Sequence, residues 1–443
     1  MKSLKILSLI LVISFTSKLS HAQWASVLDD VLPVQIALSP DYSMDQTIYV
    51  VDDEKRILIS ETGGTNWLTL YEADDPQDPA QLILHIVLSP NFRHDDAIAM
   101  IMKNGTMKLS INRGQTWLTA LAPEGITDVV FSPDFDNDLV ICCVTGAMGP
   151  VNFYKSENAG ITWGDPVAEI TVGSGFYSKL WSSMDMAAKD TFAIQYDNSG
   201  LYMSYDGGKT WMNSFEAQVS VRDFVFSPKF SKDSTAFVAD VADIYKNTNL
   251  GDQLSWVNKA NFPNAFGIHF AISPDFYTDQ TIFAAVDHTG VVRSTDGGET
   301  WTPFSDGITS IYPISIAISN AYPYTLFAGS MGQDGVPDKV WKYQSYTGVG
   351  EQDLLPSLEL SVSPNPVSDQ AQVSFRLNKA SNVDLSICDL AGKIVADIYN
   401  GSLEKGNHQF RFDNSDHVLQ TGMYFCRLQT GNQQASLKMV VVK

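Results

Sequence analysis

An eight-residue phrase ending in tryptophan recurs along this 443-residue chain and constrains its fold more than any other feature. The two fullest copies, residues 204–211 and 294–301, read Ser-x-Asp-Gly-Gly-x-Thr-Trp. Looser copies occupy residues 60–67, 110–117 and 156–163, and a copy with an insertion runs from Asn247 to Trp256. A chain that repeats one local structure at regular intervals builds its core by stacking equivalent units.

The physical chemistry of this phrase predicts a tight turn between two strands. A short Asp or Asn side chain accepts hydrogen bonds from the backbone just ahead of it, and glycine supplies the positive φ that closes the turn. The tryptophan then begins the next strand and covers the turn with a large apolar face. Structural roles are therefore predicted for Ser60, Gly64, Trp67, Asn112, Gly114, Trp117, Asn158, Gly160, Trp163, Asp206, Gly208, Trp211, Asp296, Gly298 and Trp301.

A second marker, Ser-Pro followed two residues later by an aromatic side chain, precedes most copies of the phrase. It begins at Ser39, Ser89, Ser132, Ser227 and Ser273, with weaker versions at Ser183 and Ser319. The two markers define seven units of about 45 residues, each with room for four strands. Four strands in a repeat of this length are typical of a propeller blade.

The seventh unit lacks both the tryptophan phrase and a fourth strand after residues 340–343. The segment from Gln23 to Leu28 resembles the fourth strand that begins at Trp117. We therefore expect the mature N-terminus to supply the outer strand of the seventh unit. Pairing the two ends in this way would close the ring.

The tryptophan phrase resembles the Asp-box, or BNR repeat, of β-propeller proteins. In that family the box is a structural hairpin on the rim, usually far from the active face, so the resemblance implies a fold and little chemistry. The sequence thus predicts an all-β chain: a seven-bladed propeller over residues 23–346, closed by its N-terminal strand.

A different β-module follows a linker predicted at residues 347–357. Residues 358–443 read as alternating strands of a small sandwich-like domain. Its phrases are Ser363-Pro364-Asn365-Pro366, Asp389–Lys393, Gly422-Met423-Tyr424 and Lys438–Val441. They resemble the type A C-terminal sorting domain of the type IX secretion system of Bacteroidetes. The resemblance implies passage across the outer membrane by that machinery, then release or attachment to the cell surface.

Composition and the N-terminus agree with export. Residues 1–22 begin with Lys2 and Lys5, continue with a short apolar run and end in Ser-His-Ala, as a signal peptide does. A net charge of −21 argues against a nucleic-acid partner.

Cys142 and Cys143 are predicted to be buried free thiols on opposite faces of a strand, whereas a disulfide between Cys388 and Cys426 stays an open alternative. We expect a monomer without a transmembrane span, cofactor or bound metal.

Candidate binding residues come from aligning the units on the marker serine. The residue four positions earlier, near the start of each first strand, is polar in all seven units: Gln35, His85, Asp128, Lys179, Asp223, His269 and Ser315. These side chains would ring the mouth of the central channel, where they could bind a metal or a sugar, or perform acid–base chemistry. Tyr177 and Trp181 would add a stacking platform. The alternative is that polar residues at a wet strand end have no function, and that Trp181 simply packs between blades.

Two further readings stay open. Asp pairs four residues apart, such as Asp41 with Asp45, could cradle a cation, although repetition in successive units favours turn capping.

Sialidases carry Asp-boxes but need a triad of arginines, which Arg56, Arg93, Arg113, Arg222 and Arg293 do not supply in a matching context. Xyloglucan-cleaving relatives place their site between two propellers, and this chain has room for one. The sequence favours a binding scaffold for glycan or protein, with a polysaccharide hydrolase or lyase as the alternative.

Overall fold

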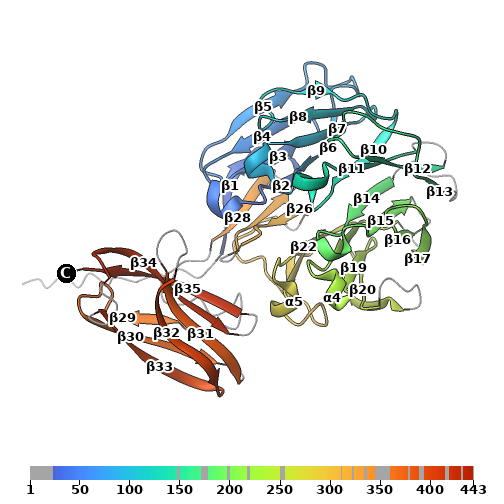
Figure 1. Cartoon of the computed structure of the whole chain (residues 1–443). Coiled ribbons are helices and arrows are strands. Elements are labelled where there is room, and N and C mark those ends of the chain that lie inside the picture. The colour runs from blue at the N-terminus through green and yellow to red at the C-terminus, as the bar shows by residue number, and fades with distance from the viewer. Residues whose placement is uncertain are drawn as a thin grey trace, which may run out of the picture.

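The computed structural model describes residues 23–146, 150–170, 178–196, 200–216, 220–249, 255–310, 312–321, 324–333, 337–344, 360–377, 380–388, 394–414, 419–430 and 433–442. The predicted signal peptide, the predicted linker and Tyr177 lie outside these ranges. Nearly every described element is a strand, as the repeats predict (Figure 1).

The described residues 23–344 form seven four-stranded antiparallel sheets, numbered here in chain order. Sheet 1 contains β2 (Pro33–Leu38), β3 (Ile48–Asp52), β4 (Arg56–Ser60) and β5 (Leu68–Glu72). Sheet 2 contains β6 (Ile83–Leu88), β7 (Ile98–Met102), β8 (Met107–Ser110) and β9 (Leu118–Thr119). Sheet 3 contains β10 (Ile126–Phe131), β11 (Ile141–Thr145), β12 (Val151–Ser156) and β13 (Ala168–Ile170).

The remaining sheets of this region follow the same order. Sheet 4 contains β14 (Ser178–Ser182), β15 (Phe192–Tyr196), β16 (Leu201–Ser204) and β17 (Met212–Phe215). Sheet 5 contains β18 (Asp223–Phe226), β19 (Ala236–Ala239), β20 (Asp243–Asn247) and β21 (Val257–Asn261). Sheet 6 contains β22 (Ile268–Ile272), β23 (Ile282–Val286), β24 (Gly290–Ser294) and β25 (Thr302–Pro303). Sheet 7 contains β26 (Pro313–Ile318), β27 (Leu326–Ser330), β28 (Lys339–Gln344) and β1 (Gln23–Asp29).

The seven sheets are arranged in a ring around their first strands (Figure 1). Each first strand lies against the first strand of the next sheet, and β26 of sheet 7 lies against β2 of sheet 1. The second strands are buried on both faces, as in β3, where every residue from Ile48 to Asp52 is buried. Burial on both faces is expected for a sheet that is packed between two others.

The ring is closed by the two ends of the 23–344 region. Strand β1 pairs antiparallel with β28, from Gln23 opposite Gln344 to Asp29 opposite Lys339. Trp24 is only 2% exposed, and its Nε1 donates a hydrogen bond of 2.7 Å to the carbonyl oxygen of Phe304 in sheet 6. The N-terminal segment therefore provides the outer strand of sheet 7, as the sequence predicts.

A one-turn helix follows the first strand in five sheets: α1 (Tyr42–Asp45), α2 (Phe92–Asp95), α3 (Phe135–Asp138), α4 (Phe230–Asp233) and α5 (Phe276–Asp279). Sheet 4 has the 3₁₀ turn η1 (Met186–Ala188) at this place. The first residue of each α-helix is a buried aromatic side chain, the one that the Ser-Pro marker carries two positions after its proline. The marker thus anchors the helix by burying this ring.

The C-terminal region contains two further sheets. One has the order β29 (Ser361–Ser363), β30 (Gln370–Leu377) and β33 (Gly406–Asp413). The other has the order β32 (Ile394–Leu403), β31 (Ser381–Cys388), β34 (Gly422–Thr430) and β35 (Gln433–Val441). A single hydrophobic core takes residues from both sheets, including Val373 and Phe412 from the first and Leu385, Leu428 and Met439 from the second.

All four cysteines are buried and free. Cys142 and Cys143 lie in two different core clusters, as expected for neighbours on opposite faces of β11. Cys426 lies directly opposite Ile387 in the neighbouring strand, so Cys388, one residue further, projects from the other face of the sheet. This alternation explains why Cys388 and Cys426 are not joined in a disulfide.

Candidate functional site

The polar residues aligned from the sequence form a ring near the start of the first strands. In sheets 1, 2, 3 and 7 the pairing of the first and second strands shifts register immediately before Gln35, His85, Asp128 and Ser315. A bulge of this kind re-aims the side chain that follows it. These residues and their equivalents Lys179, Asp223 and His269 are called the polar ring below.

Members of the polar ring contact the backbone of the next sheet. The Gln35 side chain donates to the Ile86 carbonyl oxygen at 2.8 Å and accepts from the Ile86 N–H at 2.9 Å. The Ser315 hydroxyl of sheet 7 donates to the Pro33 carbonyl oxygen of sheet 1 at 2.7 Å. The Gln35 bonds join two consecutive sheets, and the Ser315 bond joins the last sheet to the first, so both residues have a structural role in the ring.

Asp128 and Asp223 make the same pair of contacts in sheets 3 and 5. One carboxylate oxygen accepts from the N–H of the following residue, at 2.7 Å for Asp128 and 2.9 Å for Asp223. The other oxygen accepts from the backbone N–H of Leu180 or of Phe270 in the next sheet, at 2.9 Å in both cases. Both carboxylates therefore bridge neighbouring sheets.

The two imidazoles of the ring each face one of these carboxylates. Nε2 of His85 lies 2.8 Å from Oδ1 of Asp128. Nδ1 of His269 lies 3.9 Å from Oδ2 of Asp223, and desolvation lowers the pKa of His269 although the Asp223 charge acts in the opposite direction. At neutral pH the His269 imidazole is therefore uncharged.

Lys179 contacts sheet 5, and Trp181 packs inside the structure. The Lys179 ammonium donates to the Arg222 carbonyl oxygen at 3.5 Å. The Trp181 ring lies 5.6 Å from the ring of Phe224 between sheets 4 and 5 and belongs to their core. Trp181 therefore packs between two sheets, which is the alternative to a role in sugar stacking. Tyr177, the other residue of the predicted stacking platform, lies outside the described residues.

The tryptophan phrases form the hydrogen-bonded turns that their residues predict. In the copy that ends at Trp301, the Ser294 hydroxyl donates to Asp296 at 2.7 Å and accepts from the Gly298 N–H at 2.8 Å. Asp296 also accepts from the Thr300 N–H at 2.9 Å. The tryptophan Nε1 donates to the Gly298 carbonyl oxygen at 3.2 Å. All these partners lie within the turn, so the motif is explained by local structure.

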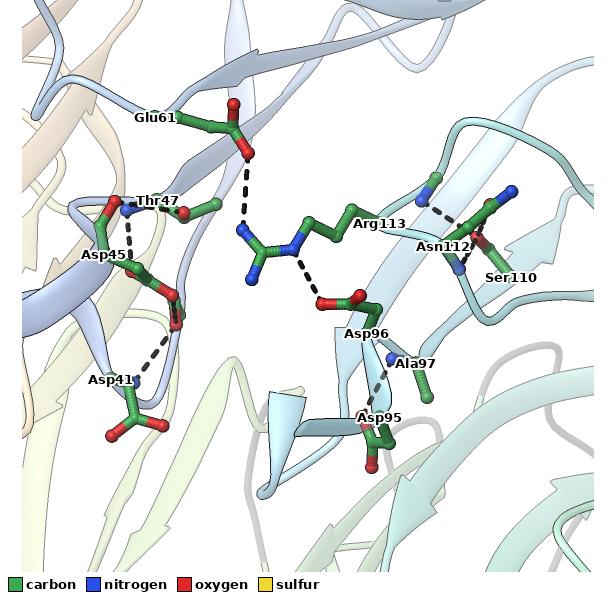
Figure 2. Close-up of polar contacts among 12 residues, drawn as sticks. Asp41, Asp45, Thr47, Glu61, Asp95, Asp96, Ala97, Ser110, Asn112 and Arg113 are labelled. Carbon is green, nitrogen blue, oxygen red and sulfur yellow. Dashed lines mark hydrogen bonds and ion pairs between the residues drawn. The ribbon is translucent and has the colours of Figure 1, made fainter. Parts of the chain in front are cut away.

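The phrase of sheet 2 adds a link to sheet 1 (Figure 2). Arg113 occupies a position with φ of 59°, where the copies in sheets 1, 4 and 6 have Gly63, Gly207 and Gly297. Its guanidinium donates to Asp96 at 2.6 Å and to Glu61 of sheet 1 at 3.3 Å. The ion pairs raise the pKa of Arg113 although desolvation acts against this.

The repeated Asp pairs after the first marker hold the one-turn helices. In sheet 1 the Ser39 hydroxyl donates to Asp45 at 2.7 Å, and the second Asp45 oxygen accepts from the Thr47 N–H at 2.9 Å (Figure 2). The serine-to-carboxylate bond recurs at Asp95, Asp138, Asp233 and Asp279. Among the described residues no group of three or more His, Cys, Asp or Glu side chains is arranged to hold a metal ion.

A cavity of about 470 Å³ lies between sheets 3 and 4, at the ends of the strands where the tryptophan phrases turn. Both lysines of its lining form ion pairs: Lys189 lies 3.4 Å from Asp138 of the lining and 3.0 Å from Asp134 outside it, and Lys155 lies 3.1 Å from Glu157. The polar ring does not contribute to it. We assign no ligand to this cavity.

Sequence reasoning missed a group of residues on the loops beside the ring. Phe266 is 67% exposed and its ring lies 5.4 Å from that of His288, which in turn lies 4.7 Å from the ring of Tyr312. Arg222, next to the ring residue Asp223, is exposed. Phe266 and Tyr312 both lie seven residues before the marker serine of their unit, so an alignment extended three residues further back would have found them. Arg222 and His288 carried no such signal.

The residues proposed for the sorting motif lie at the edge of the C-terminal sheets. The Asn365 side chain accepts a bond of 2.9 Å from the Val440 N–H, and Val367 forms a parallel bridge with Val441. Gly422 begins β34, and the Tyr424 hydroxyl donates to the Gln420 carbonyl oxygen at 3.0 Å. Pro364 and Pro366 flank Asn365, and the backbone of Lys438 pairs with Phe425. The motif therefore fixes the last strand to the start of the domain.

Comparison with solved structures places the ring among the β-propellers. YCF48 from Cyanidioschyzon merolae has a TM-score of 0.51 at 16% identity, over 73% of this chain and 99% of that one. A structure described as YCF48 bound to D1 peptide has a TM-score of 0.51 at 13% identity, over 74% and 96%. The GH74 xyloglucanase from Xanthomonas campestris has a TM-score of 0.52 at 16% identity, over 80% of this chain but only 59% of the enzyme. At these identities the likeness shows the fold alone.

Sequence comparison identifies the C-terminal region. No curated protein matches the chain by sequence. Residues 361–443 match the family described as "Secretion system C-terminal sorting domain". In the described part of the chain, no helix is long and apolar enough to cross a membrane. The family match confirms the predicted type IX sorting domain, which implies export to the cell surface or the extracellular space.

Proposed function

We propose that residues 23–346 form a seven-bladed propeller of the BNR/Asp-box class, with the seven sheets as its blades. Residues 358–443 are then a β-sandwich sorting domain, and residues 1–22 a signal peptide that is removed on export. The pairing of β1 with β28 and the turn geometry of the tryptophan phrases support this architecture. In this architecture the hydrogen bonds of the polar ring hold neighbouring sheets together, and those of the tryptophan phrases hold the turns.

We infer that this exported propeller is a binding scaffold for a glycan or protein ligand. The observation that carries the proposal is the use of the polar ring: Asp128 and Asp223 each give both carboxylate oxygens to backbone N–H groups of two sheets. Carboxylates held in this way support the assembly of sheets, whereas a hydrolase needs a carboxyl group that faces the substrate. Function then belongs to the loops around the ring.

A polysaccharide hydrolase or lyase is the second candidate. It is favoured by the 2.8 Å separation between Nε2 of His85 and Oδ1 of Asp128, because an imidazole beside a carboxylate is a common arrangement for acid–base catalysis. One structural neighbour is a xyloglucanase and another is bound to a peptide, so the fold is compatible with both classes.

The two candidates differ in turnover. We would incubate residues 23–443 with a panel of polysaccharides and glycan arrays, and measure both retention of the protein and release of new reducing ends or unsaturated products. Binding without product supports the scaffold. Product release that is lost in a folded His85→Ala variant would instead establish the enzyme. The control is Lys209→Ala, an exposed residue in the tryptophan phrase of sheet 4.

A further inference from the structure

We propose that the loops of sheets 4 to 7 beside the polar ring bind an anionic polysaccharide, with Lys179 and Arg222 holding its acidic group and Phe266 stacking against a sugar ring. This inference rests on the proposed scaffold function and names the ligand class. The basic–aromatic surface is defined by Lys179, Arg222, His269, Phe266, His288 and Tyr312.

The two cations of this surface, Lys179 and Arg222, lie next to each other. Lys179 lies at the start of β14, and Arg222 directly precedes β18. The Lys179 ammonium reaches the backbone oxygen of Arg222 at 3.5 Å, so the two residues adjoin. Among the described residues, neither has a carboxylate oxygen within 4.0 Å, and the nearby Asp223 accepts from the Phe224 and Phe270 N–H groups. These positive charges are therefore available to an anion.

His269 connects the cations to the aromatic side chains. It follows Phe266 by three residues, and its Nδ1 lies 3.9 Å from Oδ2 of Asp223, the residue directly after Arg222. Desolvation and the positive charges of Lys179 and Arg222 lower the pKa of His269, and the carboxylates of Asp223 and Asp287 act in the opposite direction. A neutral imidazole offers one donor and one acceptor, which suits a sugar hydroxyl.

The aromatic part of the surface is formed by three loops. Phe266 precedes β22, His288 lies in the turn between β23 and β24, and Tyr312 precedes β26. The loops are tied together, because the Asp287 N–H donates to the Gly267 carbonyl oxygen at 3.0 Å. The His288 ring meets that of Phe266 at 63° and that of Tyr312 at 83°. The exposed apolar face of Phe266 thus lies beside the polar atoms of the His288 imidazole and the Tyr312 phenol.

This combination fits a charged sugar better than other anions. A pyranose has an apolar C–H face for an aromatic ring and hydroxyl groups for imidazole and phenol, and a uronate or sulfated sugar adds the negative charge. A nucleic acid is disfavoured by the net charge of −21. Phe266 is the one wholly apolar side chain among the six residues of the surface, whereas a protein partner normally buries a larger hydrophobic centre.

The test is equilibrium binding of residues 23–443 to polygalacturonate, dextran sulfate and uncharged xyloglucan. Arg222→Ala and Phe266→Ala change exposed residues and leave the sheets intact. We expect each to weaken binding of the acidic polymer by roughly tenfold, and added salt to weaken binding further. The matched controls are Lys209→Ala, exposed in the tryptophan phrase of sheet 4, and Tyr277→Ala, exposed in α5; both leave the affinity unchanged.

The outcomes separate this inference from the scaffold function. Preference for polygalacturonate identifies a carboxylate as the bound group, and preference for dextran sulfate identifies a sulfate. Equal binding of xyloglucan, or acidic-polymer binding that Phe266→Ala and Arg222→Ala do not alter, would overturn the anionic-glycan site while leaving a scaffold in place. Binding of a protein alone would do the same. Turnover of any polymer would overturn the scaffold itself.

Discussion

The side-chain amide of Gln35 pairs with the backbone of Ile86 in the next sheet through two hydrogen bonds, of 2.8 and 2.9 Å. It thus imitates one residue of a neighbouring strand. Ile86 is 1% exposed, so loss of this partner would leave a buried N–H and a buried carbonyl group without a hydrogen bond.

Gln35→Ala is therefore expected to lower the free energy of unfolding by about 1–3 kcal/mol. Gln35→Glu keeps an acceptor for the Ile86 N–H but sets a carboxylate against the Ile86 carbonyl oxygen, so it is expected to cost at least as much. Denaturant unfolding measures both. Gln115→Ala, at an exposed position, is the matched control and stays within about 0.5 kcal/mol of the parent. A neutral Gln35→Ala would contradict the role of this contact.

Closure of the ring by β1 gives the second prediction. Trp24 is buried, and its Nε1 donates to the carbonyl oxygen of Phe304 in sheet 6, whereas Trp163 of the tryptophan phrase in sheet 3 is only partly buried. Trp24→Ala is expected to cost about 3–5 kcal/mol, and more than Trp163→Ala. Trp24→Phe keeps an aromatic ring but loses the 2.7 Å hydrogen bond, which costs about 1 kcal/mol. Thermal and denaturant unfolding are the measurements, and equal losses at the two tryptophans would argue against closure through β1.

The sequence predicted the units and their turns because these depend on local chemistry. The serine, the short acceptor and the glycine of each phrase bond within eight residues, and the aromatic residue of each marker is buried close by. Contacts between sheets were not predictable in the same way. The alignment found Gln35 and Asp128, but their partners Ile86 and Leu180 lie about 50 residues away, at a height set by the stagger of two sheets.

The basic–aromatic surface was also not predicted from the sequence. Phe266, His288 and Tyr312 come from three different loops. Phe266 and Tyr312 stand at the same place in two successive units, but the contact of both rings with His288 depends on how sheets 6 and 7 adjoin. Lys179 was found by alignment, whereas its neighbour Arg222 was considered only as one arginine of an absent triad.

The tryptophan phrases carry Asp at one position in some copies and Asn in others, and this difference predicts how stability depends on pH. Hydrogen bonds from the Thr210 hydroxyl and N–H lower the pKa of Asp206 from 3.8 to about 2. A carboxyl whose pKa is lower in the folded state stabilises the fold above its unfolded pKa, and this contribution is lost as the pH falls from about 4 to about 2. Asp206→Asn removes this dependence.

The amide is expected to fit, because Asn112 accepts from the Thr116 N–H at 2.9 Å and donates through its amide to the Thr116 hydroxyl at 2.8 Å, with only the direction of the hydroxyl bond reversed. Stability measured by urea unfolding between pH 2 and 7 should therefore fall less steeply in acid for Asp206→Asn than for the parent. An unchanged acid slope would show that Asp206 does not titrate as its hydrogen bonds require. Asp74→Asn, at an exposed Asp outside the phrases, is the control.

The last prediction separates strain from charge at Arg113. Its φ of 59° disfavours any side chain by about 1 kcal/mol relative to glycine, and its guanidinium recovers stability through Asp96 and Glu61 (Figure 2). Arg113→Ala keeps the strain and loses both ion pairs, so it is expected to cost about 1–2 kcal/mol. Arg113→Gly loses the same pairs but relieves the strain, and should be more stable than Arg113→Ala by about 1 kcal/mol. Salt should narrow the gap between parent and variants without changing the gap between Ala and Gly, because only the ion pairs are screened. Equal stabilities for Ala and Gly would mean that this turn does not need a left-handed residue.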